Sequence, residues 1–152
     1  MSLADAVIAS QGAPIEWKGR HVFGILRRTV SSGDRIRVEW VSAIEQPTQG
    51  LSLNAPSGGI FSVNGQSLEK VVLWADTAPA VVELDCRFAQ SAGEVRIWNC
   101  WKGSLGSTDA WLNNAGLLVS DAPDGLLLRC SSGPGDPSFD DLIVKLSFLP
   151  PR

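Results

Sequence analysis

The sequence predicts an all-β protein, a two-sheet antiparallel β-sandwich with about nine or ten strands. Short runs that alternate apolar and polar residues recur along the chain, which is the period of a half-buried strand. Residues typical of turns, such as Asn64-Gly65, separate these runs at intervals of about ten residues. Helical periodicity is nearly absent. Together these observations indicate strands that pack as two facing layers.

The N-terminal part of the chain is expected to begin irregularly and then to alternate. Residues 1–13 are expected to be irregular or to form one short helix near Ser2–Ala9. The first strand is predicted at Arg20–Arg28. The second, at Arg35–Ile44, follows a polar Ser-Ser-Gly-Asp turn and has apolar residues at every second position.

Three shorter strands are predicted in the middle of the chain. Gly50–Leu53 and Gly59–Val63 are apolar runs of strand length. Asn64-Gly65 then predicts a tight hairpin, because both central residues of a type I′ turn need a positive φ. Leu68–Ala75 is the next predicted strand.

A hairpin from Ala80 to Trp101 is the most detailed local prediction. Ala80–Phe88 alternates so that Cys86 faces the core, and Glu94–Trp101 would return beside it. One outer face of the hairpin would then carry Glu83, Asp85, Arg87, Arg96, Trp98 and Lys102. A tryptophan among charged residues suits a ligand with an apolar side and hydroxyl groups. The alternative is that another part of the chain or another subunit covers Trp98.

The C-terminal part adds three predicted strands and completes one domain. Leu117–Ser120 and Leu126–Cys130 flank an Asp-Ala-Pro-Asp-Gly turn, and Asp141–Leu149 closes the chain. No repeat or long linker divides the sequence, so we expect a single domain over residues 1–152. So many strands do not fit one open sheet, which favours two packed sheets, and a jelly roll is our preferred topology.

Composition and charge exclude several classes of protein. The chain has 152 residues, is 44% hydrophobic and 19% charged, and carries a formal net charge of −3, as expected for a globular domain. The acidic balance argues against a nucleic-acid partner. No apolar run approaches the roughly 20 residues that span a bilayer, so no membrane partner is expected. The N-terminus lacks the basic start of a secretory signal, which predicts a cytoplasmic location.

The cysteines and the single histidine indicate neither a disulfide framework nor a metal centre. Cys86, Cys100 and Cys130 are odd in number, widely spaced and free of Cys-x-x-Cys spacing. His21 could serve neither a zinc site nor a catalytic triad without further partners, and we expect it to be structural. No cofactor is predicted.

The tryptophans are the best candidates for ligand contact. The chain has six tryptophans and no tyrosine. Trp17, Trp40 and Trp74 lie in apolar or strand contexts and are expected in the core. Trp101 and Trp111 bracket a polar loop, 102–110, which could form the rim of a binding site. The alternative is an ordinary connection anchored by two buried indoles.

The carboxylates offer two further candidate chemistries. Asp136, Asp140 and Asp141 are the candidate ligands of a calcium site, although no spacing resembles an EF-hand. Glu83 with Asp85, or Asp140 with Asp141, could act as paired carboxylates in a hydrolase. Turn aspartates are also common for backbone reasons alone.

The segment Phe139-Asp140-Asp141-Leu142-Ile143-Val144 resembles the closing strand of galactose-binding-like jelly rolls, including several carbohydrate-binding modules. The resemblance covers these six residues and implies binding of a glycan or another ligand. Our first hypothesis is a non-catalytic module that binds a carbohydrate-like or other small polar ligand. Its expected contacts are Trp98, Trp101, Trp111, Asp85, Arg87, Arg96 and Lys102. The alternatives are an assembly protein that forms a homo-oligomer or partner contacts, and a small carboxylate-dependent hydrolase.

Overall fold

Strands dominate the structure, a computed structural model that describes residues 2–11, 13–56 and 58–152. The elements in chain order are α1 (Leu3–Ala9), β1 (Ile15–Trp17), β2 (Arg20–Val22), β3 (Leu26–Ser31), β4 (Arg35–Ala43), β5 (Gln49–Asn54), β6 (Ile60–Val63), β7 (Gln66–Leu68), β8 (Lys70–Trp74), β9 (Val81–Arg87), β10 (Ala92–Lys102), β11 (Thr108–Asp109), β12 (Gly116–Ala122), β13 (Gly125–Ser131) and β14 (Leu142–Leu149). The predicted all-β class is confirmed, but the described residues form fourteen strands rather than the nine or ten that were expected. Within the described ranges, no helix is long and apolar enough to cross a membrane.

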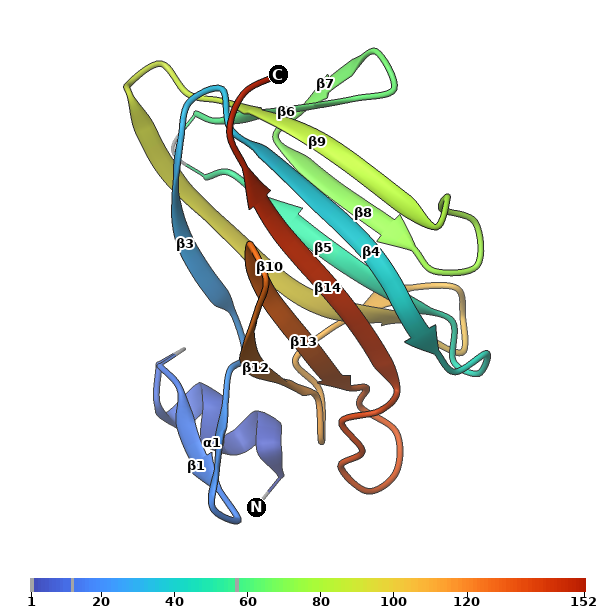
Figure 1. Cartoon of the computed structure of the whole chain (residues 1–152). Coiled ribbons are helices and arrows are strands. Elements are labelled where there is room, and N and C mark those ends of the chain that lie inside the picture. The colour runs from blue at the N-terminus through green and yellow to red at the C-terminus, as the bar shows by residue number, and fades with distance from the viewer. Residues whose placement is uncertain (1, 12, 57) are drawn as a thin grey trace.

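Two antiparallel sheets form the layers of a sandwich, as predicted (Figure 1). The seven-stranded sheet has the order β12-β13-β14-β4-β9-β6-β7. The five-stranded sheet has the order β11-β10-β5-β8, and β3 pairs with β10 as well. β10 pairs with β5 along one of its edges, and along its other edge it pairs with β3 and then with β11. A separate hairpin, β1-β2, lies beside α1 at one end of the molecule (Figure 1).

The strands from β3 to β10 pair in a nested order. β3 pairs with β10, β4 with β9, β5 with β8 and β6 with β7. The chain therefore crosses between the two sheets at most of its connections. A jelly roll is nested in this way, but β12, β13 and β14 extend one sheet beyond β4, and the jelly-roll order stays a prediction.

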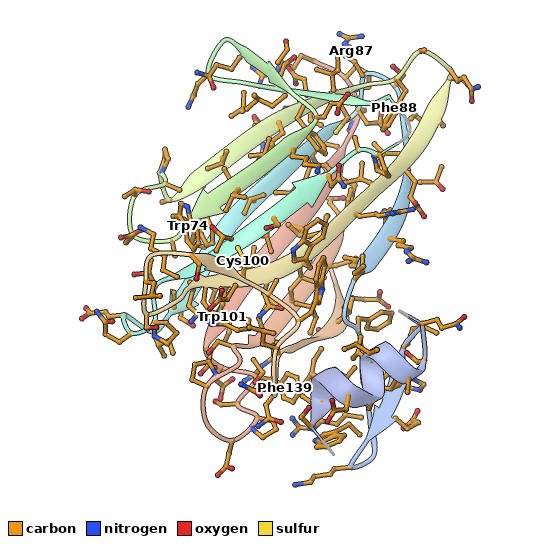
Figure 2. The ribbon with its side chains drawn as sticks, turned by 180° about the vertical axis from the view of Figure 1, so that it is seen from behind. Trp74, Arg87, Phe88, Cys100, Trp101 and Phe139 are labelled. Atoms are coloured by element: carbon orange, nitrogen blue, oxygen red, sulfur yellow. The ribbon has the colours of Figure 1, made fainter. Side chains whose placement is uncertain are left out.

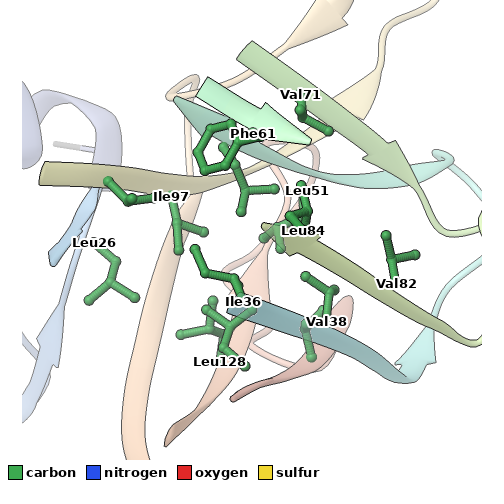
Figure 3. Packing of buried hydrophobic residues seen from close by; sticks show 14 of the residues in the cluster. Leu26, Ile36, Val38, Leu51, Phe61, Val71, Val82, Leu84, Ile97 and Leu128 are labelled. Carbon is green, nitrogen blue, oxygen red and sulfur yellow. The ribbon is translucent and has the colours of Figure 1, made fainter. Parts of the chain in front are cut away.

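Alternation along each strand builds the core between the layers. Figure 3 shows Ile36, Leu84 and Leu128 of one sheet meeting Leu51 and Ile97 of the other. All five side chains are fully buried, and each contributes about 2 kcal/mol through the apolar surface it removes from water. The period of two found in the sequence thus fixes which face of each strand is covered.

One buried hydrogen bond also joins the two layers. Asn99 of β10 is 3% exposed, and its Nδ2 donates to the carbonyl oxygen of Ser131, at the end of β13, at 2.9 Å. A buried amide needs such a partner, because an unpaired one costs about 1–3 kcal/mol. The bond therefore sets the relative position of β10 and β13.

Of the two expectations for the N-terminal segment, irregular chain or a short helix, the structure shows the helix, at α1. The Ser2 hydroxyl accepts from the Asp5 backbone N–H, and the Asp5 carboxylate accepts from the Ser2 backbone N–H, which completes a capping box. These hydrogen bonds with Ser2 hold the pKa of Asp5 below its usual value. Leu3 then packs with Val22 and Phe139 in a small second cluster.

Two predicted strands are each divided in the structure. The expected strand Arg20–Arg28 becomes β2 and β3, because Phe23 forms a bridge with Leu117 while β3 pairs with β10. The expected strand Leu68–Ala75 becomes β7, which pairs with β6, and β8, which pairs with β5. The turn before it is confirmed, with φ of 50° at Asn64 and 75° at Gly65.

The predicted hairpin from Ala80 to Trp101 is wrong. β9 pairs with β4 and β6 in the seven-stranded sheet, whereas β10 pairs with β3 and β5 in the five-stranded sheet. The inward and outward faces of each strand are nevertheless as predicted, since Leu84 and Ile97 are both fully buried. Alternation determines which side chains share a face but not which strand lies next to it.

Candidate functional site

The outer face of the five-stranded sheet brings several of the predicted ligand-binding residues together. The register aligns its outward side chains in rows that cross the strands. The first row contains Arg27, Arg96, Asn54 and Lys70. The second row contains Trp98, Ser52 and Val72. The third row contains Cys100, Gly50 and Trp74. Successive rows are about 7 Å apart, two residues along a strand.

Trp98 and Trp111 form an aromatic platform on this face. Their ring centroids lie 4.9 Å apart with an interplanar angle of 35°. Trp111 is 39% exposed, and its Nε1 donates to the Gly24 carbonyl oxygen at 3.0 Å. This bond satisfies the polar edge of the indole while leaving part of the ring in solvent. Both Trp98 and Trp111 were predicted to contact ligand, and the structure places them together.

The backbone of Trp111 is held in an unusual conformation. Its φ is 56°, in the left-handed region that bulky residues rarely adopt. The stack on Trp98 and the hydrogen bond to Gly24 fix the side chain in place. Such strain costs of the order of 1–3 kcal/mol and is concentrated at ligand-binding sites and switch regions.

Trp74 is a third indole on the same face, where the sequence had indicated a core position. It covers Gly50, because a Cβ atom on that glycine would lie 2.7 Å from Cε3 of Trp74 and 3.0 Å from Sγ of Cys100. Lys102 Nζ lies 5.1 Å from the centre of the Trp74 ring, within the range of a cation–π interaction. Figure 2 shows Trp74, Cys100 and Trp101 near one another on the side of β10.

Trp101 is not an exposed platform, contrary to its predicted role. It is 3% exposed, and it packs against Gly133, where an added Cβ would lie 2.5 Å from its ring. The loop that follows it does border a hollow of about 570 Å³. Polar residues around this hollow are Gln46, Thr48, Lys102, Ser104, Asp109 and Asn113. Lys102 belongs both to this hollow and to the outer face.

Asp85 and Arg87 do not belong to the site, contrary to prediction. They lie on β9 in the other sheet, because β9 and β10 are not partners. Asp85 faces Arg152 at 3.7 Å, and Figure 2 places Arg87 at the far end of the molecule from Trp101. These two residues therefore cannot share a ligand with Trp98.

The carboxylate pair Glu83 and Asp85 is engaged in ion pairs. Glu83 Oε1 accepts from Arg35 at 3.0 Å and from Arg37 at 3.1 Å. The hydrogen bond from Arg37 holds the pKa of Glu83 below its ordinary value, with partial desolvation acting in the opposite direction. A carboxyl group with a lowered pKa is ionised at neutral pH and does not suit the general acid of a glycosidase.

The three candidate calcium ligands do not converge. Asp140 forms an ion pair with Arg129. Asp141 accepts from the backbone N–H and the hydroxyl of Ser132, at 3.0 and 2.8 Å. Asp136 borders a separate hollow near Trp17. Among residues 2–11, 13–56 and 58–152, no group of three histidine, cysteine or acidic side chains could hold a metal ion.

The three cysteines are free and buried. Burial, with a smaller contribution from the charges of Asp34 and Asp85, raises the pKa of Cys86 to about 12. Burial also raises the pKa of Cys130 and of Cys100, although a hydrogen bond from Ser52 partly opposes the shift at Cys100. Thiols of this kind are poor nucleophiles.

Sequence reasoning missed Arg27, Lys70 and Trp74 as members of this face. One signal was present, because Lys70, Val72 and Trp74 alternate with apolar residues of β8. The strand pairing that sets them opposite Arg96 and Trp98 was not visible in the sequence.

Searches against protein-family models, curated proteins and solved structures found no match for this chain. The similarity of the segment 139–144 to galactose-binding-like jelly rolls therefore stays a prediction. The function has to be inferred from the site alone.

Proposed function

We propose that this chain is a binding module for a carbohydrate-like ligand, with the outer face of the five-stranded sheet as its binding surface. The observation that carries the proposal is the Trp98–Trp111 platform. Sugar rings stack their apolar faces on indoles, and their hydroxyl groups require hydrogen-bonding partners at the edge of the stack. A platform that is fixed before the ligand arrives avoids the entropic cost of ordering it on binding.

Polar partners border the platform on the same face. Arg96 lies two residues before Trp98 on β10, and its Nε donates to Glu94 at 2.9 Å. Asn54 of β5 pairs with Arg96 of β10 and is partly exposed. Arg27 borders a hollow that Trp111 also lines. Guanidinium, carboxylate and amide groups beside an indole are the set that a polyhydroxylated ring needs.

The proposal is tested by removing the platform. Trp98→Ala and Trp111→Ala are titrated by calorimetry against a panel of neutral and acidic oligosaccharides, with Trp17→Ala as the matched control. Trp17 is also partly exposed but lies on β1, in the N-terminal hairpin. We expect the wild type to bind at least one member and each platform variant to lose about tenfold in affinity, whereas the control binds normally.

Two outcomes would contradict the proposal. One is that no oligosaccharide in the panel binds to the wild type. The other is that the platform variants and Trp17→Ala bind equally well while circular dichroism shows that all of them are folded.

Assembly is a second candidate function, favoured by an apolar hollow of about 540 Å³ beside α1. Ile8 and Trp111 border it, and Ile8 is 69% exposed. A second copy of the chain could cover such a surface. Sedimentation velocity at increasing protein concentration distinguishes self-assembly from ligand binding. A strictly monomeric species would contradict self-assembly without affecting the carbohydrate-binding proposal.

A further inference from the structure

A row of cationic side chains runs across the proposed binding surface. Arg27 of β3 lies directly opposite Arg96 of β10. On the other side of β10, Arg96 lies opposite Asn54 of β5, and Asn54 in turn lies opposite Lys70 of β8. The row spans three strand spacings, about 14 Å at roughly 4.8 Å each. Like charges directly opposite each other on a sheet are destabilising, so the Arg27–Arg96 pair has a cost in the free protein.

These cations have little internal compensation. Arg96 forms an ion pair with Glu94, at 2.9 Å. In the part of the chain that the structure describes, Arg27, Lys70 and Lys102 have no carboxylate within salt-bridge distance. The outward strand residues of this face comprise four cations and one carboxylate, a net charge of +3, whereas the whole chain carries −3.

The opposite face of the sandwich differs in that most of its outward cations lie beside carboxylates and its aromatic side chains face the core. On the seven-stranded sheet, the outward cations Arg35 and Arg37 are bound to Glu83, and Lys145 lies opposite Glu39. Arg87, at the end of β9, has no carboxylate within salt-bridge distance among the described residues. Its aromatic residues in the described strands, such as Phe61 and Phe148, lie on the rows that face the core. Among the described residues, uncompensated cations therefore lie beside partly exposed indoles on the five-stranded face.

We propose that the ligand of this face is an acidic oligosaccharide, one that carries carboxylate or sulfate groups on its sugar rings. This inference rests on the carbohydrate-binding function proposed above and adds the sign of the ligand's charge. Sugar rings stack on Trp98 and Trp111 while their anionic groups lie over the neighbouring row of Arg27, Arg96 and Lys70. Bound anions relieve the repulsion between Arg27 and Arg96, and guanidinium groups bind carboxylate and sulfate through paired hydrogen bonds.

The same surface suits a single-stranded nucleic acid less well. Such chains use a series of separate aromatic side chains, with one stacking position for each base. Here Trp98 and Trp111 stack on each other at 4.9 Å and so provide one platform. The chain as a whole is acidic, with a pI of about 5.1, which opposes a dense polyphosphate.

The test compares a galacturonic acid tetramer with a neutral galactose tetramer of the same length by calorimetry. We expect the acidic tetramer to bind more tightly, and its affinity to fall as salt is raised to about 1 M, where the Debye length is about 3 Å. Arg27→Gln/Arg96→Gln is expected to weaken acidic binding about fivefold. The matched control is Lys145→Gln, which removes a cation from the outer face of the other sheet.

The possible results distinguish the acidic-ligand proposal from the carbohydrate-binding proposal on which it rests. Equal binding of both tetramers, or an unchanged acidic affinity in the double arginine variant, overturns the acidic ligand and leaves carbohydrate binding intact. Absence of binding to either tetramer and to the wider panel overturns both. Tighter binding of a thymidine oligonucleotide than of the acidic tetramer overturns the acidic sugar in favour of a nucleic acid. Thermal unfolding of the double arginine variant verifies that it is folded.

Discussion

Gly50→Ala tests how closely Trp74 is packed onto the sheet. The added Cβ would lie 2.7 and 2.8 Å from two carbons of the Trp74 ring, against an optimum of about 3.5–4.0 Å for carbon pairs. The ring must therefore move by nearly 1 Å, or β5 must shift. Overpacking of this kind costs about 1–3 kcal/mol.

A second effect acts in the opposite direction. Gly50 lies in β5 and needs no positive φ, so alanine there loses less conformational entropy on folding, by about 0.5–1 kcal/mol. We therefore expect Gly50→Ala to lower the free energy of unfolding by about 0.5–2 kcal/mol. In a Trp74→Ala background the ring is absent, and the same substitution should be neutral or slightly stabilising.

The assay is a double-mutant cycle measured by urea unfolding. Circular dichroism is the appropriate signal, because Trp74→Ala itself changes the tryptophan fluorescence. The coupling free energy between the two substitutions should be about 1–3 kcal/mol. If Gly50→Ala costs the same with and without the indole, Trp74 does not cover Gly50 and the description of this end of the site is wrong.

Two further predictions concern ionisable groups. The lowered pKa of Glu83 contributes stability above its ordinary value of 4.5, and this contribution is lost as the pH falls through the lower, folded-state pKa. In urea unfolding over acidic pH, the wild type should have a higher free energy of unfolding than Glu83→Gln, and this difference should shrink toward low pH. A difference that stays constant with pH would refute the ion-pair origin of the pKa shift. Burial raises the pKa of Cys86 to about 12 and also raises those of Cys100 and Cys130. Ellman's reagent at mildly alkaline pH should therefore react slowly with the native protein, whereas in denaturant it should react with all three thiols. Rapid reaction of the native protein would show that a thiol is accessible.

Some features of the fold were predictable because their causes are local. The alternation in Arg35–Ala43 and in Leu142–Leu149 identified β4 and β14, since burial of one face requires a period of two. Asn64-Gly65 identified its turn because few other residue pairs accept two positive φ angles. The sequence also indicated that Trp98 points away from the core, because Ile97 next to it must point inward.

The composition of the site depended on contacts between distant segments. Asp85 and Trp98 are close in sequence, yet they lie on different sheets. Trp101 and Trp111 bracket one loop, yet Trp101 is buried while Trp111 reaches across to Gly24 and stacks on Trp98. Arg27 and Lys70 belong to the same row because β10 and β5 lie between their strands, although the 42 residues from 28 to 69 separate them in the sequence.

The sequence by itself determined the class of fold, most of the strands and the face on which each side chain lies. Only the tertiary structure decided which strands are neighbours, and with that which tryptophans and cations share one surface. The physical reason is that the direction of a side chain follows from the backbone geometry of its own strand, whereas strand pairing is selected by the packing of the whole core. A binding surface made of rows across several strands is therefore defined only when the sheet has assembled.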